Sequence, residues 1–165
     1  MNTDLPPALA DWSDAPRCRR LTDPPFRSEG RYDLCWLQQA LRSHDNPVID
    51  AAVRLGNALG RPVLVYHGLR EDYPFASARL HRFILGASRD VAVGCGKRGL
   101  ACIQYVDRAA KREKGLVYRL AAEAAAVVLE DQPAFVAQWQ AERVAAKSGT
   151  AVLAFDAGRA EGRSA

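Results

Sequence analysis

Residues 32–66 read YDLCWLQQALRSHDNPVIDAAVRLGNALGRPVLVY, and this stretch decides the fold class. It begins with a short apolar run, Tyr32–Leu37, and ends with a second one, Pro62–Tyr66. Between them Asn46-Pro47 opens a helix, because a proline in the first turn loses no helical hydrogen bond, and Gly60 ends it. A short apolar strand, an amphipathic helix and another apolar strand are typical of a parallel sheet.

The same alternation continues as far as residue 155. Apolar runs predict three further strands, and apolar residues at three- and four-residue spacing predict further helices. The strands are expected at Ala101–Val106, Ala125–Leu129 and Ala151–Phe155, and the helices at Ala76–Arg98, at Leu116–Ala125 and from Pro133 onward. The strands are nearly all apolar, as strands covered on both faces are. The sequence therefore predicts an α/β fold, a doubly wound five-stranded parallel sheet with helices on both faces, Rossmann-like in architecture.

A length of 165 residues corresponds to about one domain. Residues 1–30 are rich in proline, aspartate and arginine and show no periodicity, so we expect an extended lead-in arm, poorly ordered unless it docks on the domain. The α/β domain is expected over 31–157, beginning at Arg31. Residues 158–165 are small and polar and are expected to form a flexible tail.

Composition places the chain among globular proteins, with 48% hydrophobic and 25% charged residues. The longest apolar run, Ala124–Leu129, is far shorter than the ~20 residues of a membrane-spanning helix. The first thirty residues lack the apolar core of a signal peptide, so a soluble cytoplasmic protein is expected. The four cysteines match no zinc-binding spacing and are expected to be free thiols.

Positive charge is concentrated in residues 76–119, which carry ten Lys or Arg against three Asp or Glu. Such a zone can attract phosphate groups or nucleic acid, with an affinity that falls steeply as salt is added. The same count also fits a solvated helix face followed by a charged loop, and the residues alone favour that interpretation.

Ligands of doubly wound sheets bind beyond the carboxyl ends of the strands, where the strand order switches. The polar residues expected near these ends are the candidate cofactor-binding residues Gln38, Gln39, Arg42, His67, Glu130 and Asp131. Glu130 and Asp131 suit a metal ion or a ribose hydroxyl, but such a pair also solvates a loop and supports the next helix N-terminus. No catalytic set and no metal site are expected.

One glycine motif is rejected as a nucleotide-binding signal. Residues 94–99 read GCGKRG, which fits G-x-G-x-x-G letter for letter. In a dinucleotide-binding domain that motif follows a strand and opens a helix, so that free backbone N–H groups meet the phosphates. Here the glycines close a predicted helix and precede a strand, so they indicate a helix end and a turn.

Several segments together resemble the DNA photolyase and cryptochrome family. The resemblance covers roughly residues 18–156 and rests on the following segments: Gly30–Trp36, Leu41-Arg42, Asp45–Pro47, Tyr73–Phe83, Lys114–Leu116, Glu130-Asp131 and Pro133–Phe135. The segments from Tyr73 onward are most similar to bacterial photolyases of the class II type. Gln38–Ala40 stands where many members of the family carry Arg-Arg-Asp.

The resemblance implies that this chain is the N-terminal, antenna-type domain of such a protein. In that family the domain can hold a folate or a deazaflavin, while a larger helical domain binds FAD and cleaves pyrimidine dimers, a carbon–carbon lyase reaction. No FAD site is expected in this chain, which would act only with a separate FAD-binding domain and would meet DNA only indirectly. Two alternatives stay open: a stand-alone nucleotide-binding module, and an inactive remnant.

Overall fold

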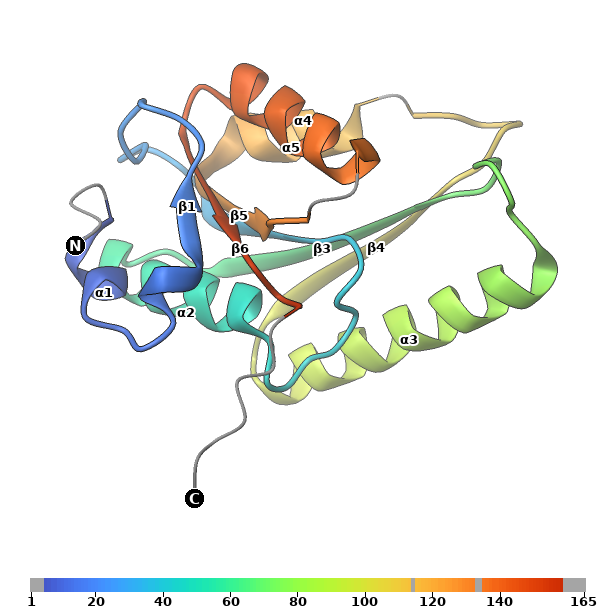
Figure 1. The fold of residues 1–165 in the computed structure, drawn as a ribbon, viewed down its shortest axis with the longest axis horizontal. Helices are drawn as coiled ribbons and strands as arrows, with labels where there is room; N and C mark the ends of the chain where they lie inside the picture. Colours follow the sequence, from blue (N-terminus) through green and yellow to red (C-terminus); the bar gives the residue numbers. More distant parts are fainter. Residues whose placement is uncertain (1–4, 114, 133–134, 159–165) are drawn as a thin grey trace.

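The computed structural model describes residues 5–113, 115–132 and 135–158, and within them a six-stranded sheet forms the centre of the molecule (Figure 1). The strands, in the order β1-β6-β5-β2-β3-β4, are β1 Cys18–Arg20, β6 Ala151–Phe155, β5 Ala124–Glu130, β2 Tyr32–Leu37, β3 Val63–Arg70 and β4 Ala101–Asp107. The helices are α1 Pro7–Ala10, α2 Pro47–Leu59, α3 Ala78–Lys97, α4 Leu116–Glu123 and α5 Phe135–Ser148, with a short 3-10 turn, η1, at Ala15–Arg17. The five predicted strands are present and parallel to one another, as expected.

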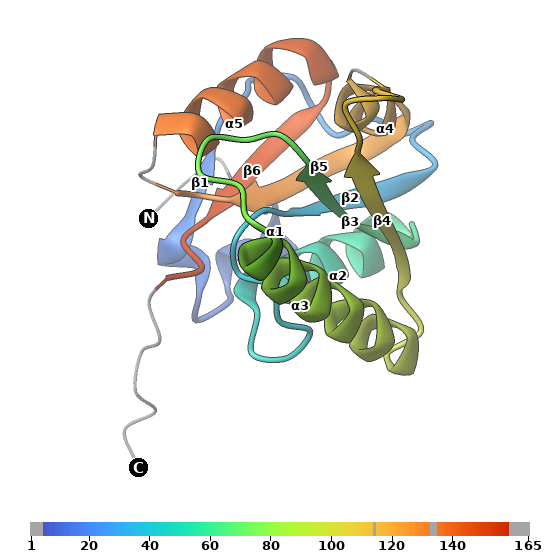
Figure 2. The ribbon, with the colours of Figure 1, turned by 90° about the vertical axis from the view of Figure 1, so that its right-hand side faces the viewer.

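Helices cover both faces of the sheet (Figure 2). α1, α2 and α3 pack on one face, and α4 and α5 on the other. Because side chains of a strand alternate between faces, each strand feeds two cores. In β2, for example, Cys35 and Leu37 join the core under α2, while Leu34 and Trp36 join the core under α4 and α5. This double burial explains why the strands are apolar throughout.

The strand–helix–strand unit that opens the domain forms as the sequence predicts. The Asn46 side chain caps α2 by accepting a hydrogen bond from the backbone N–H of Val48 at 3.0 Å. Gly60 ends the helix at φ 64°, a left-handed conformation that glycine adopts without strain. The register then places Cys35 of β2 beside Val65 of β3.

The glycine motif at residues 94–99 ends a helix, as predicted. α3 runs through its first two glycines to Lys97, and Gly99 turns the chain at φ 71° toward β4. Gly94 is needed for packing, since an added Cβ there would lie 2.0 Å from the Ser43 hydroxyl oxygen.

The N-terminal segment is not the extended arm that the sequence predicts. β1 pairs antiparallel with β6, Cys18 lying opposite Phe155, so the sheet has six strands and ordered structure begins well before Arg31. Leu9 of α1 is fully buried, and the Trp12 ring lies 5.9 Å from that of Phe155. The segment escapes prediction because β1 has only three residues, two of them charged, and edge strands need no apolar outer face.

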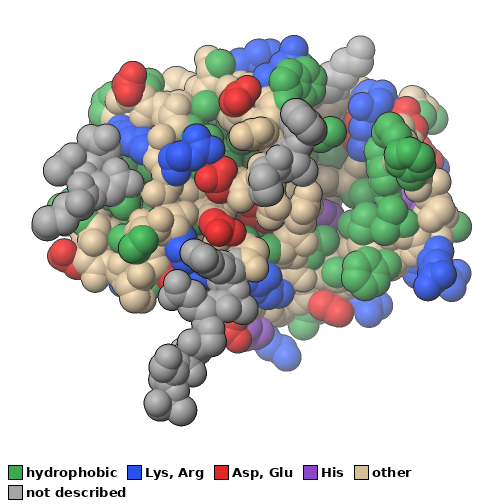
Figure 3. Space-filling model, in the orientation of Figure 1, with side chains coloured by type: hydrophobic (Ala, Val, Ile, Leu, Met, Phe, Trp, Pro, Cys, Tyr) green, Lys and Arg blue, Asp and Glu red, His purple; other side chains and the backbone are tan. Residues whose placement is uncertain are grey.

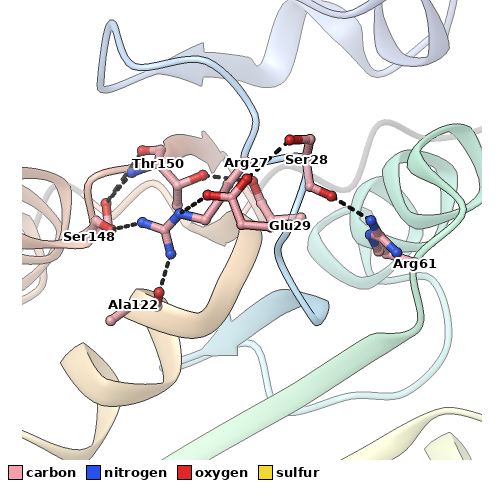
Figure 4. Close-up of polar contacts among 8 residues, drawn as sticks. Arg27, Ser28, Glu29, Arg61, Ala122, Ser148 and Thr150 are labelled. Atoms are coloured by element: carbon pink, nitrogen blue, oxygen red, sulfur yellow. Dashed lines mark hydrogen bonds and ion pairs between the residues drawn. The ribbon is translucent and has the colours of Figure 1, made fainter.

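The connection from β1 to β2 is fastened at the amino end of the sheet (Figure 4). The Arg27 guanidinium donates to the backbone oxygen of Ala122 at the end of α4 and to that of Ser148 at the end of α5. On the other side, the Arg61 guanidinium donates to the backbone oxygen of Ser28. One loop therefore joins both helical layers at the end of the sheet opposite to its carboxyl ends.

α5 places Trp139 on its outer side. This residue is 54% exposed, and the Arg143 guanidinium lies 4.0 Å from its ring centroid. Val144, on the other side of the helix, is fully buried. The predicted helix start at Pro133 and the predicted tail from residue 159 lie outside the described residues.

Candidate functional site

The carboxyl ends of β2 and β5 lie side by side at the centre of the sheet, and the chain leaves them toward opposite faces. β2 leads to α2 on one face, and β5 leads to α5 on the other. This is the switch in strand order at which open α/β sheets bind their ligands. Two cavities lie beside this switch, one on each face of the sheet. A third, of about 490 Å³, lies between β1 and α5 and has Asp131 in its lining.

The first cavity, on the face of α4 and α5, has a volume of about 460 Å³. Four rings line it, Trp36, Tyr66, Tyr105 and Tyr118, and we call it the aromatic cavity. Trp36 and Tyr66 are neighbours in the register of β2 and β3, and Tyr105 lies beside Gly68 on the next strand. Burial raises the pKa of Tyr66 to about 12, so its hydroxyl stays protonated at neutral pH. Aromatic rings offer flat π-faces on which a planar ligand can stack.

Charged side chains from the ends of β3 and β4 form the rim of the aromatic cavity. Arg112 contacts Asp72 at 2.7 Å and Asp107 at 3.3 Å, and Arg70 contacts Asp72 at 2.8 Å. Hydrogen bonds from the two guanidinium groups hold the pKa of Asp72 well below its usual range. The Oδ1 atom of Asp107 is buried and has no hydrogen-bond partner among the described residues. The rim therefore contains a buried acceptor that the described residues leave unsatisfied.

Gln38 reaches the aromatic cavity from the loop after β2, as its predicted place near a strand end suggests. Its Nε2 donates to Oε1 of Gln140 on α5 at 2.9 Å. Its own Oε1 is buried without a partner among the described residues. Gln38 thus adds a second buried acceptor without a partner among the described residues.

The second cavity, on the α3 face, has a volume of about 340 Å³ and is more apolar. Gln39 and His67, two of the predicted site residues, line it together with Phe83, Ile84 and Leu41. Gln38 lines both cavities. The predicted residues are therefore divided between the two faces of the sheet rather than gathered around one ligand.

His67 lies within β3, which is longer than the predicted strand and ends at Arg70 rather than Tyr66. The ring is 4% exposed, and its Nδ1 lies 2.8 Å from the Ser88 hydroxyl of α3. That hydroxyl also accepts a hydrogen bond from Gln104 at 2.6 Å. Burial lowers the pKa of His67, so the ring is neutral at neutral pH. These contacts fasten α3 to β3 and β4.

Three predicted residues make contacts within the protein and line neither of the two cavities beside the switch. Glu130 is 1% exposed and accepts hydrogen bonds from the loop after β2. Asp131 forms a two-bond ion pair with Arg19 of β1, with distances of 2.9 and 3.2 Å. Arg42 donates to the backbone oxygens of Asp45 and Ala157. The presence of a polar side chain at a strand end does not indicate which residue it contacts in the folded protein.

The four rings of the aromatic cavity were not identified from the sequence as candidate ligand-binding residues. Trp36 is 7% exposed and packs in the core under α4 and α5, and it also lines the cavity. An available signal was an aromatic residue in each of three successive strands: Trp36, Tyr66 and Tyr105. Tyr118, on α4, had no comparable signal.

Apolar side chains are exposed near the carboxyl ends of β3 and β4. Phe75 is 96% exposed and adopts φ 67°, and Phe83 on α3 is 73% exposed. Figure 3 shows hydrophobic side chains gathered on the right-hand side of the molecule, where Figure 1 places the start of α3. A positive φ is unusual for a bulky residue, and here it accompanies an outward-facing ring.

The basic zone of residues 76–119 is partly neutralised in the structure. Arg98 pairs with Asp50 of α2 at 2.7 Å, and Arg119 pairs with Glu113 at 2.7 Å. Arg112 belongs to the rim of the aromatic cavity. At least these three cations are paired with acidic side chains of the protein, which favours the interpretation of the zone as a charged protein surface.

Among known proteins, part of the chain is similar to the deoxyribodipyrimidine photo-lyase of Methanothermobacter thermautotrophicus. The match is 34% identical over 89 residues, covering 54% of this chain and 20% of that protein, so the chain spans about a fifth of the relative's length. This supports a photolyase-related region. A universal stress protein family member from Burkholderia pseudomallei superposes with a TM-score of 0.48 at 19% identity, over 76% of this chain and 96% of that one. No family model matches the chain.

None of the helices in the described part of the chain is both long enough and apolar enough to cross a membrane. Nor do the described histidine, cysteine and acidic side chains form a group of three that could hold a metal ion.

Proposed function

We propose that the chain is a photolyase-type antenna domain that holds a planar chromophore, a folate or a deazaflavin, in the aromatic cavity. The observation that carries the proposal is the lining of four rings beside the switch in strand order, in a chain whose sequence is partly similar to a photolyase. A cavity of this size fits the range of small-molecule sites, which are mostly apolar with a few placed polar groups.

Within this site the rings stack on the chromophore and two oxygens orient it. Gln38 Oε1 and Asp107 Oδ1 are buried acceptors without partners among the described residues, so a ligand that donates N–H groups satisfies both. Arg42, Glu130 and Asp131 take no part, because their charged groups are engaged in contacts within the protein.

Light-dependent repair of DNA would require a partner. We infer that this partner is a separate domain that binds FAD and the damaged DNA, and that the present chain meets DNA only through it. The match to one fifth of a photolyase fits a chain that supplies one component of such a protein. We also propose that the chain is related to bacterial photolyases of the class II type and that the protein is cytoplasmic.

Two alternatives make different use of the same features. In a stand-alone nucleotide-binding module, a base would stack on the rings in place of the chromophore. In an inactive remnant, the exposed Phe75 and Phe83 would be the remains of a surface that a lost domain once covered.

The proposal is tested by absorption and fluorescence spectra of the purified chain, before and after adding folate, deazaflavin or adenosine. We expect a chromophore to bind and the variant Tyr105→Leu, which removes one stacking ring, to bind about tenfold more weakly. Phe83→Leu is the matched control, because it removes an aromatic ring outside the aromatic cavity, and it should bind normally. Blank spectra with both chromophores would overturn the antenna function, and binding of adenosine alone would favour the nucleotide module.

A further inference from the structure

The loop that follows β2 presents three consecutive backbone N–H groups to one carboxylate. The N–H of Gln38 donates to Oε1 of Glu130 at 2.8 Å. The N–H groups of Gln39 and Ala40 each contact both carboxylate oxygens, at 3.1 to 3.2 Å. A further hydrogen bond, from Gln132 Nε2 at 3.2 Å, reaches Oε2. The carboxylate is thus surrounded by donors.

This arrangement is held by rigid parts of the fold. Glu130 is the last residue of β5, and the loop begins directly after β2, its parallel neighbour. From the other side, Nδ2 of Asn46 donates to the backbone oxygens of Ala40 and Arg42, both at 2.9 Å. Asn46 is fully buried at the start of α2. The three N–H groups therefore point toward Glu130 because the loop is anchored at both ends.

Successive N–H groups that converge in a turn form a concave site for an anion. In α/β domains that bind nucleotides, the turn after a strand at the switch point receives a phosphate group. The Glu130 carboxylate fills the corresponding place here, with most of its surface removed from water. A phosphate entering this turn would have to displace a buried anion that already accepts all three N–H groups.

We propose that Glu130 is an internal anion that occupies the phosphate position of the loop after β2 and excludes phosphate-bearing ligands from it. The carboxyl edge then selects ligands that bring no anion to this turn. Gln38 and Asp107, which line the neighbouring aromatic cavity, favour the same selectivity, because each has a buried acceptor oxygen that needs a hydrogen-bond donor. The selectivity for ligands that donate hydrogen bonds rests on the proposed function of the aromatic cavity. The role of Glu130 does not depend on whether a chromophore binds there.

The test replaces the carboxylate with free anions. Glu130→Ala removes a fragment equal in shape to acetate, so acetate or inorganic phosphate can fill the space and restore the hydrogen bonds. We expect the melting temperature of this variant to rise by several degrees with either anion, relative to chloride at the same ionic strength. The wild-type chain should show no such rise, because its turn is occupied.

Asp131→Ala is the matched control, because it removes the adjacent carboxylate, which pairs with Arg19 and contacts no backbone N–H of the loop. It should show no rescue. A folded Glu130→Ala chain that neither anion stabilises would overturn the proposal.

A measurement on the wild-type chain decides the question if Glu130→Ala does not fold. ATP and adenosine are titrated in parallel by calorimetry. ATP binding no tighter than adenosine supports exclusion of phosphate, whether or not either binds. ATP binding tenfold tighter or more than adenosine would overturn it. Neither result depends on folate or deazaflavin, so failure of the antenna function is distinguishable from failure of this inference.

Discussion

Two buried carboxylates lie on neighbouring strands near opposite ends of the sheet, and their surroundings differ completely. Glu130, at the carboxyl end, accepts three backbone N–H groups. Asp33, at the amino end of β2, is fully buried, and both of its oxygens lack a hydrogen-bond partner among the described residues. Burial raises the pKa of Asp33 to about 7, with Arg61 opposing the shift. A buried carboxylate is stabilising only where the backbone is arranged to receive it.

The largest expected effect comes from breaking the favourable site. Glu130→Ala leaves three N–H groups of a part-buried loop without their acceptor, and it should lower the free energy of unfolding by about 2–4 kcal/mol. Chemical denaturation without added acetate or phosphate measures this loss. A change below about 0.5 kcal/mol, the range of ordinary surface substitutions, would show that water replaces the carboxylate without cost.

A smaller effect of opposite sign is expected at the unfavourable site. Because the pKa of Asp33 is raised in the folded protein, folding takes up a proton, and stability is lost as the pH rises from roughly 4 to roughly 7. Asp33→Asn removes this dependence. Relative to wild type, the variant should gain about 1–3 kcal/mol between pH ~4.5 and pH ~8.

The comparison of two pH values isolates Asp33 from other titrating groups. The lowered pKa of His67 acts in the opposite direction, since its contribution is lost as the pH falls below that of an unperturbed histidine. That contribution is the same in both chains and cancels in their difference. Parallel stability curves for wild type and Asp33→Asn would show that the Asp33 carboxyl group is not perturbed.

The smallest effect is expected at the carboxylate next to Glu130 in the sequence. Asp131 and Arg19 form a partly exposed ion pair, with side-chain exposures of 30% and 57%. Such pairs contribute about 0.2–1 kcal/mol, so Arg19→Ala and Asp131→Ala should each cost that much. The double variant should cost no more than either single one. Additive losses would mean that the two side chains act separately.

Much of the fold was predictable because its signals are local. The apolar runs of β2 and β6, the helix start at Asn46-Pro47 and the turn at Gly60 each depend on neighbouring residues, and the structure confirms them. β1 was not predictable, because three residues at a sheet edge are held by backbone pairing with β6, over 130 residues away in sequence. Its side chains carry no periodic signal.

The position of the site was predictable from the sequence, but the residues that form it were not. Its position at the carboxyl ends follows from the parallel sheet. The role of Glu130 did not follow, because its partners are backbone N–H groups some 90 residues away, which no side-chain pattern reveals. The same limit applied to Tyr118, which enters the aromatic cavity from a helix rather than from a strand end.

The pairing of β1 with β6 has a practical consequence for handling the protein. β6 consists of five fully buried apolar residues, Ala151–Phe155, and β1 covers its outer edge. A shortened chain beginning at Arg31, where composition suggests the domain starts, would expose that edge as an uncharged apolar strand. Such edges recruit strands from other molecules. The N-terminal segment is therefore also the feature that protects the sheet from aggregation.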